Sequence, residues 1–299
     1  MLNLQTVHEK IFQIRLHECD VYRHINNANY MRYILEVAYD SHVVAGHDHH
    51  HYQAMRRKWV LHSCEIEYLC PIKYGDSVRL KSWVVDFRGS HSRRMYEIYS
   101  VNEGELAARA STDWVLIDLD SNRPTAVPPE IVADFLPSHV SREAPPETPP
   151  PASPVPACAF KMRRRVTWHD IDPSGHVHQS MYLCYLDDCG MKLAATFGWT
   201  LTRMWEAGFG IIVQRHEIEF LRDAVMDDEL EIATWLSSVK RVTADRIYTI
   251  TRVKDNVLLA RVRTLYVWVD PKTGGVKRMP KDFSDDFDHN LVKLEHTQS

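Results

Sequence analysis

The chain contains the same pattern twice, and this internal repeat constrains its fold more than any other feature. Asp20 and Asp172 lie 152 residues apart, and the same offset aligns almost the whole chain without a gap. It places CEIEYL at 64–69 on HEIEFL at 216–221. Further identical pairs are Tyr33 with Tyr185, Trp83 with Trp235, Arg94 with Arg246, Asp118 with Asp270 and Pro128 with Pro280. One register held through so many identities indicates a duplicated domain.

A proline-rich segment separates the two copies. Residues 142–158 read REAPPETPPPASPVPAC, and prolines this dense fix φ, remove backbone donors and favour extended polyproline II. The sequence therefore predicts an N-terminal domain at 1–137, a linker at 138–159 and a C-terminal domain at 160–299. At about 3.1 Å per residue the linker reaches roughly 50 Å, enough to cross the face of one compact domain, so a strap between packed copies and a loose tether both stay open on length alone.

Each copy is predicted to contain one strand, one long helix and then about four strands. In the first copy the strand lies at 10–16 and the helix at 29–44, where apolar residues recur every three or four positions. Alternating runs then predict the strands, at 59–69, 77–87, 93–102 and 106–119. The second copy repeats the pattern, with a strand at 161–168 and a helix at 181–197. The predicted fold class is α+β, with an antiparallel sheet of about five strands against one long central helix.

A polar motif precedes the helix in both copies. It reads DVYRHINNANY at 20–30 and DPSGHVHQSMY at 172–182, with Asp, His and Tyr at equal spacings. An Asp near a helix start is often its N-cap, but here the helical pattern begins about seven residues later, which is too far for simple capping. The pattern therefore favours a functional role for Asp20 and Asp172.

This order of elements and motif resembles the hotdog-fold thioesterases. DVYRHINNANY resembles the motif of bacterial long-chain acyl-CoA thioesterases, and DIDPSGHV at 170–177 resembles a stretch of 4-hydroxybenzoyl-CoA thioesterase. The resemblance covers roughly residues 8–135 and 160–287. It implies a sheet wrapped around the helix in each of two tandem domains, which would pair side by side as an intrachain pseudo-dimer with sites between them. Further homo-oligomerisation stays open.

The resemblance implies hydrolysis of acyl-CoA thioesters. It places Asp20 and Asp172 where the family has its carboxylate, acting as nucleophile or as general base toward water. It also places the oxyanion hole at backbone amides near Asn27 and Gln179, where the helix N-terminus supplies free N–H groups and a positive dipole end.

Other side chains of the motif have two readings each. His24 and His176 either orient the Asp or touch the thioester, or else bond to a loop carbonyl. Asn26 and Asn27 are read as positioning groups, and Asn27 alternatively as the helix cap.

The remaining candidate substrate-binding residues are His178, Tyr30, Tyr182, Glu65 and Glu217. Both tyrosines open the helix, which favours packing over chemistry. Both glutamates start the strand after the helix, which favours an exposed face of the sheet. The copies differ within the motif, because His178 and Gln179 replace the two asparagines. The two sites are therefore not expected to be equivalent.

No metal or cofactor is expected. The run HDHHHY at 47–52 has adjacent histidines, which on a loop rarely converge on one metal without further ligands. A Gly-rich phosphate loop is absent from the sequence, which gives no support to nucleotide hydrolysis.

Composition bounds the partners and the compartment. Hydrophobic residues make up 44% and charged residues 25%, with a net charge of −4, which predicts a soluble protein and neither nucleic acid nor membrane as partner. We expect a cytoplasmic protein, since the N-terminus shows no secretory signal and the six cysteines show no disulfide framework.

Two alternatives to an acyl-CoA thioesterase stay open: an acyl carrier protein thioesterase and a non-catalytic acyl-CoA sensor. A hydratase is disfavoured because the Pro-rich hydratase motif is missing. Acyl length is not fixed by the sequence.

Overall fold

The computed structural model describes residues 7–136 and 154–292. The chain divides into two compact units, residues 1–148 and 149–299. The predicted linker lies outside the described residues from 138 to 153. Its extended form, the predicted domain boundaries and the pairing of the two domains therefore stay predictions.

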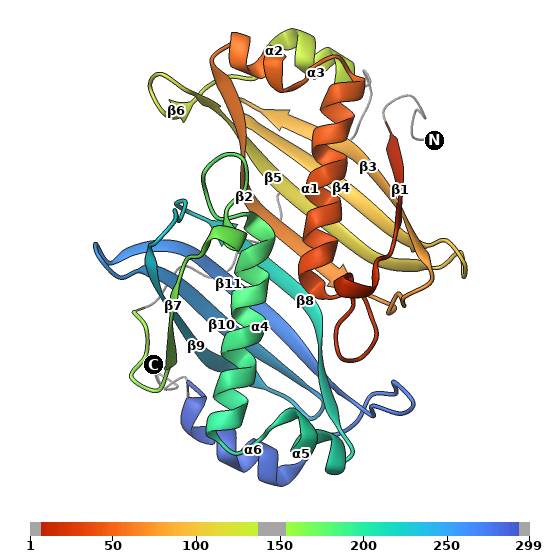
Figure 1. The fold of residues 1–299 in the computed structure, drawn as a ribbon, viewed down its shortest axis with the longest axis vertical. Helices are drawn as coiled ribbons and strands as arrows, with labels where there is room; N and C mark the ends of the chain where they lie inside the picture. The colour runs from red at the N-terminus through yellow and green to blue at the C-terminus, as the bar shows by residue number, and fades with distance from the viewer. Residues whose placement is uncertain (1–6, 137–153, 293–299) are drawn as a thin grey trace, which may run out of the picture. The chain divides into compact units, whose positions relative to one another are not determined.

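The N-terminal unit is a five-stranded antiparallel sheet with one long helix (Figure 1). Its strand order is β1-β3-β4-β5-β2. A two-residue strand, β6 (Arg123–Pro124), pairs with the end of β5. The main elements are β1 (His8–Gln13), α1 (Asn27–Val44), β2 (Arg57–Tyr68), β3 (Ser77–Arg88), β4 (His91–Ser100) and β5 (Leu106–Asp118).

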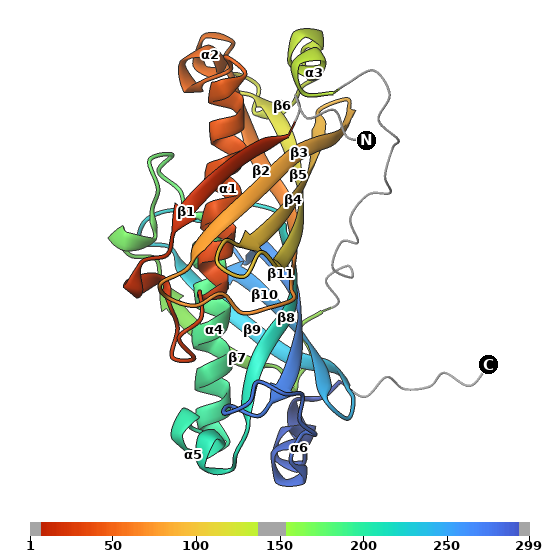
Figure 2. The ribbon, with the colours of Figure 1, turned by 90° about the vertical axis from the view of Figure 1, so that its right-hand side faces the viewer.

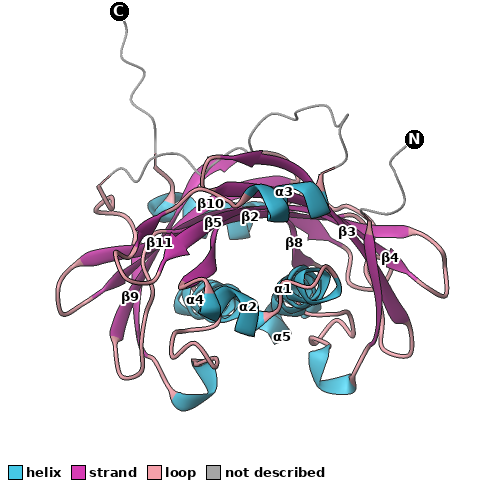
Figure 3. Cartoon of the chain, turned by 90° about the horizontal axis from the view of Figure 1, so that it is seen from above, coloured by secondary structure: helices cyan, strands magenta, loops and turns pink. Residues whose placement is uncertain are grey.

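The central helix α1 is held by a buried apolar stripe. Met31, Ile34, Val37 and Ala38 recur at helical spacing and are buried, and each fully buried aliphatic side chain stabilises the fold by roughly 1.5–3 kcal/mol. The strands alternate, as in β4, where every second residue is buried. Figure 3 shows α1 under the curve of its own sheet, and α4 under that of its own.

The C-terminal unit repeats this architecture. Its sheet has the order β7-β9-β10-β11-β8, again antiparallel throughout. The elements are β7 (Phe160–Arg165), α4 (Gln179–Thr196), β8 (Gly210–Phe220), β9 (Glu229–Val239), β10 (Thr243–Arg252) and β11 (Val257–Val269). The predicted α+β fold, a sheet of five main strands around one helix, is confirmed in both units.

Four short helices were not expected from the sequence: α2 (His49–Ala54), α3 (Pro129–Phe135), α5 (Leu201–Glu206) and α6 (Lys281–Phe287). The prediction that HDHHHY is a loop is wrong, because Asp48 caps α2 by accepting the amide of His51 at 2.9 Å. Figure 2 shows α2 and α3 at one end of the N-terminal sheet, where Tyr52 and Phe135 join one apolar cluster. Within the described residues, no helix combines the length and apolarity needed to cross a bilayer.

Candidate active site

The polar motif forms the same tight loop in both units. In the N-terminal unit the amide of Asp20 donates to the carbonyl of His24 at 2.8 Å, and the amide of Arg23 donates to the carbonyl of Asp20 at 2.9 Å. The equivalent bonds from Asp172 to His176 and from Gly175 to Asp172 both measure 2.9 Å. Two different sequences therefore fold into one main-chain conformation.

The loop is tied to the connection between the second and third strands of each sheet. Ile25 donates to the carbonyl of Ile72 at 2.9 Å, and Val177 donates to the carbonyl of Ala224 at 2.9 Å. Both apolar side chains are buried. These anchors fix each Asp loop to the connection between two strands of its own sheet, and a site with demanding geometry requires such support.

Asp20 is held by two backbone amides. Its Oδ1 accepts from Tyr22 at 2.9 Å and from His24 at 3.2 Å. Burial raises the pKa of the Asp20 carboxyl, although these hydrogen bonds and the nearby His24 ring oppose the shift. A carboxyl with a raised pKa is a better base and nucleophile once ionised than an ordinary surface Asp.

Asp172 is held differently. Its Oδ1 accepts from the amide of Ser174 at 2.7 Å and from the Ser174 hydroxyl at 2.5 Å. The same hydroxyl lies 3.1 Å from Nδ1 of His176. The second unit therefore places Asp, Ser and His in one network.

The helix after the loop begins with one unpaired amide. Asn26 is the N-cap of α1: its Oδ1 accepts from Ala28 and its carbonyl from Asn29, both at 2.9 Å. Across the described part of the chain, the amide of Asn27 has no hydrogen-bond acceptor. The alternative prediction of Asn27 as the cap is wrong, because Asn26 is the N-cap and Asn27 is already the first residue of the helix.

The second helix repeats this start with a different cap. Nδ1 of His178 accepts the amide of Ser180 at 3.2 Å, and its carbonyl accepts Met181 at 2.8 Å. The amide of Gln179 is likewise without an acceptor in the described residues. Both long helices therefore offer one amide at the positive end of the helix dipole, a geometry suited to an anionic oxygen.

The two motif histidines sit in different electrostatic surroundings. Burial lowers the pKa of His24, and neighbouring Lys73 lowers it further, while Asp20 acts in the opposite direction. His176 instead has Nε2 at 3.9 Å from a carboxylate oxygen of Asp223. In the described structure neither ring bonds to a loop carbonyl.

The two motif tyrosines lie in the core. Tyr30 is 3% exposed and Tyr182 is 2% exposed. Their rings pack edge-on against Tyr68 at 5.1 Å and Phe220 at 5.3 Å. Burial raises the pKa of both hydroxyls. This packing accounts for both side chains, and their substrate-binding role stays a prediction.

The two candidate glutamates differ in burial. Glu65 on β2 is half-buried, whereas Glu217 on β8 is only 3% exposed. The expectation of an exposed face is therefore wrong for Glu217. Its carboxylate lies 3.8 Å from guanidinium nitrogens of both Arg215 and Arg263, which offset the cost of burying the charge.

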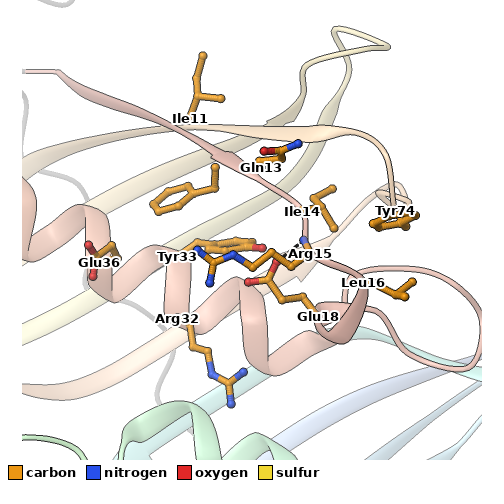
Figure 4. A pocket seen from close by; sticks show the side chains of 11 residues that line it. Ile11, Gln13, Ile14, Arg15, Leu16, Glu18, Arg32, Tyr33, Glu36 and Tyr74 are labelled. Carbon is orange, nitrogen blue, oxygen red and sulfur yellow. Dashed lines mark hydrogen bonds between the residues drawn. The ribbon is translucent and has the colours of Figure 1, made fainter.

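A surface cavity of about 700 Å³ opens in the N-terminal unit between β1, the 3₁₀ turn Leu16–Glu18 and α1 (Figure 4). Phe12 and Tyr33 stack in it with centroids 4.7 Å apart, and the figure shows Arg15 and Glu18 beside Tyr33. Neither Asp20 nor Asn27 lines it. This cavity is therefore not centred on the predicted reactive groups.

In the second unit an arginine stands at the position of Phe12. Arg164 lies over the ring of Tyr185 at 4.3 Å and pairs with Asp188 at 2.9 Å and Asp170 at 3.4 Å. The two repeats thus differ beside their loops as well as within them.

Sequence reasoning missed two features of the site. Ser174, two residues after Asp172, was not singled out, although a Ser at that spacing is typical of a side chain that closes a turn. Glu18 and Asp170, equivalent in the repeats, each close a 3₁₀ turn by accepting a backbone amide at 2.7 Å. The 152-residue offset between the repeats places Glu18 on Asp170, and this is the signal that could have found the acidic pair.

Comparison with known proteins identifies the family. The family model described as the thioesterase-like superfamily matches residues 14–135 and 166–287, which together make up more than half of the chain. The chain belongs to the thioesterase-like superfamily. The predictions of a hotdog-fold family, a tandem repeat and a thioesterase are therefore confirmed.

Two curated relatives each match over less than half of the chain. An acyl-CoA thioester hydrolase of Escherichia coli is 23% identical over 128 residues, covering 43% of this chain and 95% of that protein. A chloroplast palmitoyl-acyl carrier protein thioesterase of Cuphea hookeriana is 28% identical over 119 residues, covering 38% of this chain and 28% of that protein.

Solved structures match the superfamily fold over both repeats. An acyl-ACP thioesterase from Bacteroides thetaiotaomicron has a TM-score of 0.70 at 15% identity, covering 87% of this chain and 98% of that one. The 12:0-ACP thioesterase from Umbellularia californica has a TM-score of 0.65 at 16% identity, covering 87% and 94%. At such identities the likeness shows the fold alone.

Proposed function

We propose that this thioesterase hydrolyses acyl-CoA to the free acid and CoA, with Asp20 and Asp172 as the working carboxylates. One observation carries the proposal. In both repeats an Asp loop anchored to the connection between two strands leads directly into a long helix whose first amide, at Asn27 or Gln179, has no acceptor in the described residues.

These groups match the needs of thioester hydrolysis. The Asp carboxylate either attacks the carbonyl carbon or takes a proton from the water that attacks it. The carbonyl oxygen then becomes an oxyanion, which the amide at the helix start stabilises by a hydrogen bond and the helix dipole. When the tetrahedral intermediate collapses, the C–S bond breaks and CoA leaves as the thiolate. If water was the nucleophile, the free acid forms in this step. If the Asp carboxylate was the nucleophile, the step leaves a mixed anhydride with the Asp, which a water molecule then hydrolyses to the free acid and the regenerated carboxylate.

The relatives support an acyl thioester as the substrate, and they differ in the group that carries the acyl chain. The Escherichia coli relative is described as acting on acyl-CoA, whereas the Cuphea relative is described as acting on palmitoyl-acyl carrier protein. The chemistry at the carbonyl is the same for both carriers. An acyl carrier protein thioesterase is therefore the second candidate.

The test is hydrolysis of an acyl-CoA panel by Asp20→Asn, Asp172→Asn and the double variant. Each single variant should still hydrolyse acyl-CoA at the repeat whose Asp is unchanged. The double variant should lose about 10²–10⁴-fold, the usual contribution of a positioned acid–base group. Wild-type turnover by the double variant would refute the assignment of both carboxylates.

A further inference from the structure

A serine hydroxyl links the aspartate to the histidine in the C-terminal repeat. Ser174 Oγ lies 2.5 Å from Oδ1 of Asp172 and 3.1 Å from Nδ1 of His176. The Ser174 amide donates to the same carboxylate oxygen at 2.7 Å. Three functional groups within five residues therefore share one hydrogen-bond network.

The directions of these bonds follow from the protons available. A hydroxyl has a single proton, and an ionised carboxylate can only accept. Ser174 therefore donates to Asp172 and accepts from His176, whose Nδ1 must carry the hydrogen. In the neutral ring the lone pair is then on Nε2, where it can take up a proton.

The N-terminal repeat lacks this link. Tyr22 stands at the position of Ser174, and it bonds to Asp20 through its backbone amide at 2.9 Å. The second donor to Asp20 is the amide of His24, not a hydroxyl. In the described part of this repeat, the His24 ring makes no hydrogen bond to the carboxylate.

The charged surroundings of His176 are compatible with the assigned tautomer. Asp172 lies on its own loop, and Asp223 lies on the connection between β8 and β9 with a carboxylate oxygen 3.9 Å from Nε2. That distance is too long for a hydrogen bond. The carbonyl of Asp223 is in turn held by Arg252 at 3.3 Å.

We propose that Ser174 is a positioning residue that holds Asp172 and His176 as one hydrogen-bonded unit in the C-terminal repeat alone. Its hydroxyl orients the carboxylate and fixes the ring with Nε2 free to exchange a proton. The two repeats therefore carry non-equivalent sites. The effect on turnover rests on the proposed function, whereas the hydrogen-bonded unit does not.

The first experiment reads the tautomer without using activity. The full chain is labelled with ¹⁵N-histidine, and the His176 signals among the 17 histidines are assigned by their loss in His176→Gln. The wild type should show the Nδ1–H tautomer at neutral pH. Ser174→Ala should lose this preference, and Ser174→Thr, which keeps a hydroxyl, should restore it. An Nε2–H tautomer in the wild type, or no change in Ser174→Ala, would overturn the proposal.

The second experiment reads catalysis in the Asp20→Asn background, where only the C-terminal site has its carboxylate. Ser174→Ala should lower kcat/KM about tenfold, the scale of one hydrogen bond to a charged group, and Ser174→Thr should recover most of the loss. In a double-mutant cycle this effect should vanish once Asp172 is Asn, because the group being positioned is gone.

The two proposals fail in different ways. Full turnover by the double Asp variant would refute the proposed function. In that case the NMR measurement of the His176 tautomer would still test whether Ser174 holds Asp172 and His176 together. Equal rates for Ser174→Ala and its Asp20→Asn parent would overturn the positioning role. An inactive Asp20→Asn parent would also overturn the positioning role, because the C-terminal site would then have no activity for Ser174 to support.

Discussion

Asp20 and Asp172 occupy equivalent positions but differ in their partners. Asp20 accepts two backbone amides, whereas Asp172 accepts one amide and a hydroxyl. The difference comes from a single side chain two residues further on, because the main chain of the loop is the same in both repeats. At the residue scale, the two repeats share the carboxylate and differ in the groups that donate hydrogen bonds to it.

The raised pKa of Asp20 predicts a gain of stability when its charge is removed. Burial holds the folded-state pKa above the unfolded value, so its contribution to stability is complete at low pH and is lost as the pH rises through the folded pKa. Asp20→Asn keeps an oxygen for the turn and removes the buried charge. At pH 7 it should unfold at a higher urea concentration than the wild type, with the gap closing below the ordinary Asp pKa of 3.8.

A matched control with the opposite sign is Asp118→Asn. Hydrogen bonds from the amide and hydroxyl of Ser121 lower the pKa of Asp118. Its stabilising contribution is therefore present at neutral pH and is lost as the pH falls through the folded pKa. Asp118→Asn should not gain stability at pH 7. A urea midpoint for Asp20→Asn below that of the wild type would contradict the prediction.

The turn of the loop requires a left-handed residue, which predicts a second asymmetry. Gly175 has φ +82° with open space where a Cβ would lie, and Arg23 holds the same position at φ +64°. Gly175→Ala should therefore cost about 1 kcal/mol through the backbone alone. Arg23→Ala should lower the free energy of unfolding much less, since arginine and alanine both carry a Cβ and meet the same backbone strain. Denaturation midpoints of the two variants test this, and equal shifts would argue against backbone strain as the cause.

At the scale of the element, the two long helices begin in the same way with different chemistry. Asn26 caps α1 through its amide oxygen, and His178 caps α4 through a ring nitrogen. Each cap satisfies the second amide of its helix and leaves the first without an acceptor in the described residues. The element thus supplies the candidate oxyanion donor by its geometry rather than by a side chain.

The caps predict defined losses of stability. Asn26→Ala and His178→Ala should each lower the free energy of unfolding by about 1 kcal/mol, the usual value of an N-cap. His178→Asn should retain the wild-type midpoint, because asparagine already caps the other helix. Gln179→Ala, which touches no cap bond, is the control. No loss in the alanine variants would mean that water replaces both caps.

The uncapped amides can be removed by proline. Proline is tolerated at the first position of a helix, and Asn26 has ψ 145°, the extended conformation that a residue before proline needs. In the Asp172→Asn background, Asn27→Pro should lower kcat about 10²–10³-fold by deleting one oxyanion donor. Asn27→Ala keeps the amide and should stay near the parent rate. A folded proline variant, checked by circular dichroism, with the parent rate would exclude this amide as the donor.

At the scale of the whole molecule, the carrier of the acyl group is the open question. The proposed function predicts that the same acyl group is hydrolysed faster from CoA than from acyl carrier protein. The measurement compares kcat/KM for both carriers with the wild type and the double Asp variant. A preference for the carrier protein would select the second candidate. Tight acyl-CoA binding without turnover, unchanged in the double variant, would instead indicate a sensor.

Much of the molecule was predictable because its signals are local. Helical spacing around Met31 and Ile34 predicted α1, and strand alternation predicted the sheet, since both depend on which face is buried. The short helices α2 and α3 were not predicted, because one or two turns have too few residues for a periodic signal. The burial of Glu217 was missed for another reason: Arg215 and Arg263 meet it only once the strands are paired.

The sequence by itself determined that this chain is a duplicated α+β protein with an Asp, a His and a helix start in each copy, and the thioesterase assignment came from the resemblance of these features to a family. These features are readable because they depend on residue type, spacing and a repeat register. Only the tertiary structure decided how the Asp is held, which residue caps each helix and which amide is left without an acceptor in the described residues. Those contacts depend on how the loop folds back on itself and onto the connection between two strands. Ser174 shows the difference, since its hydroxyl lies between Asp172 and His176 only in the folded loop.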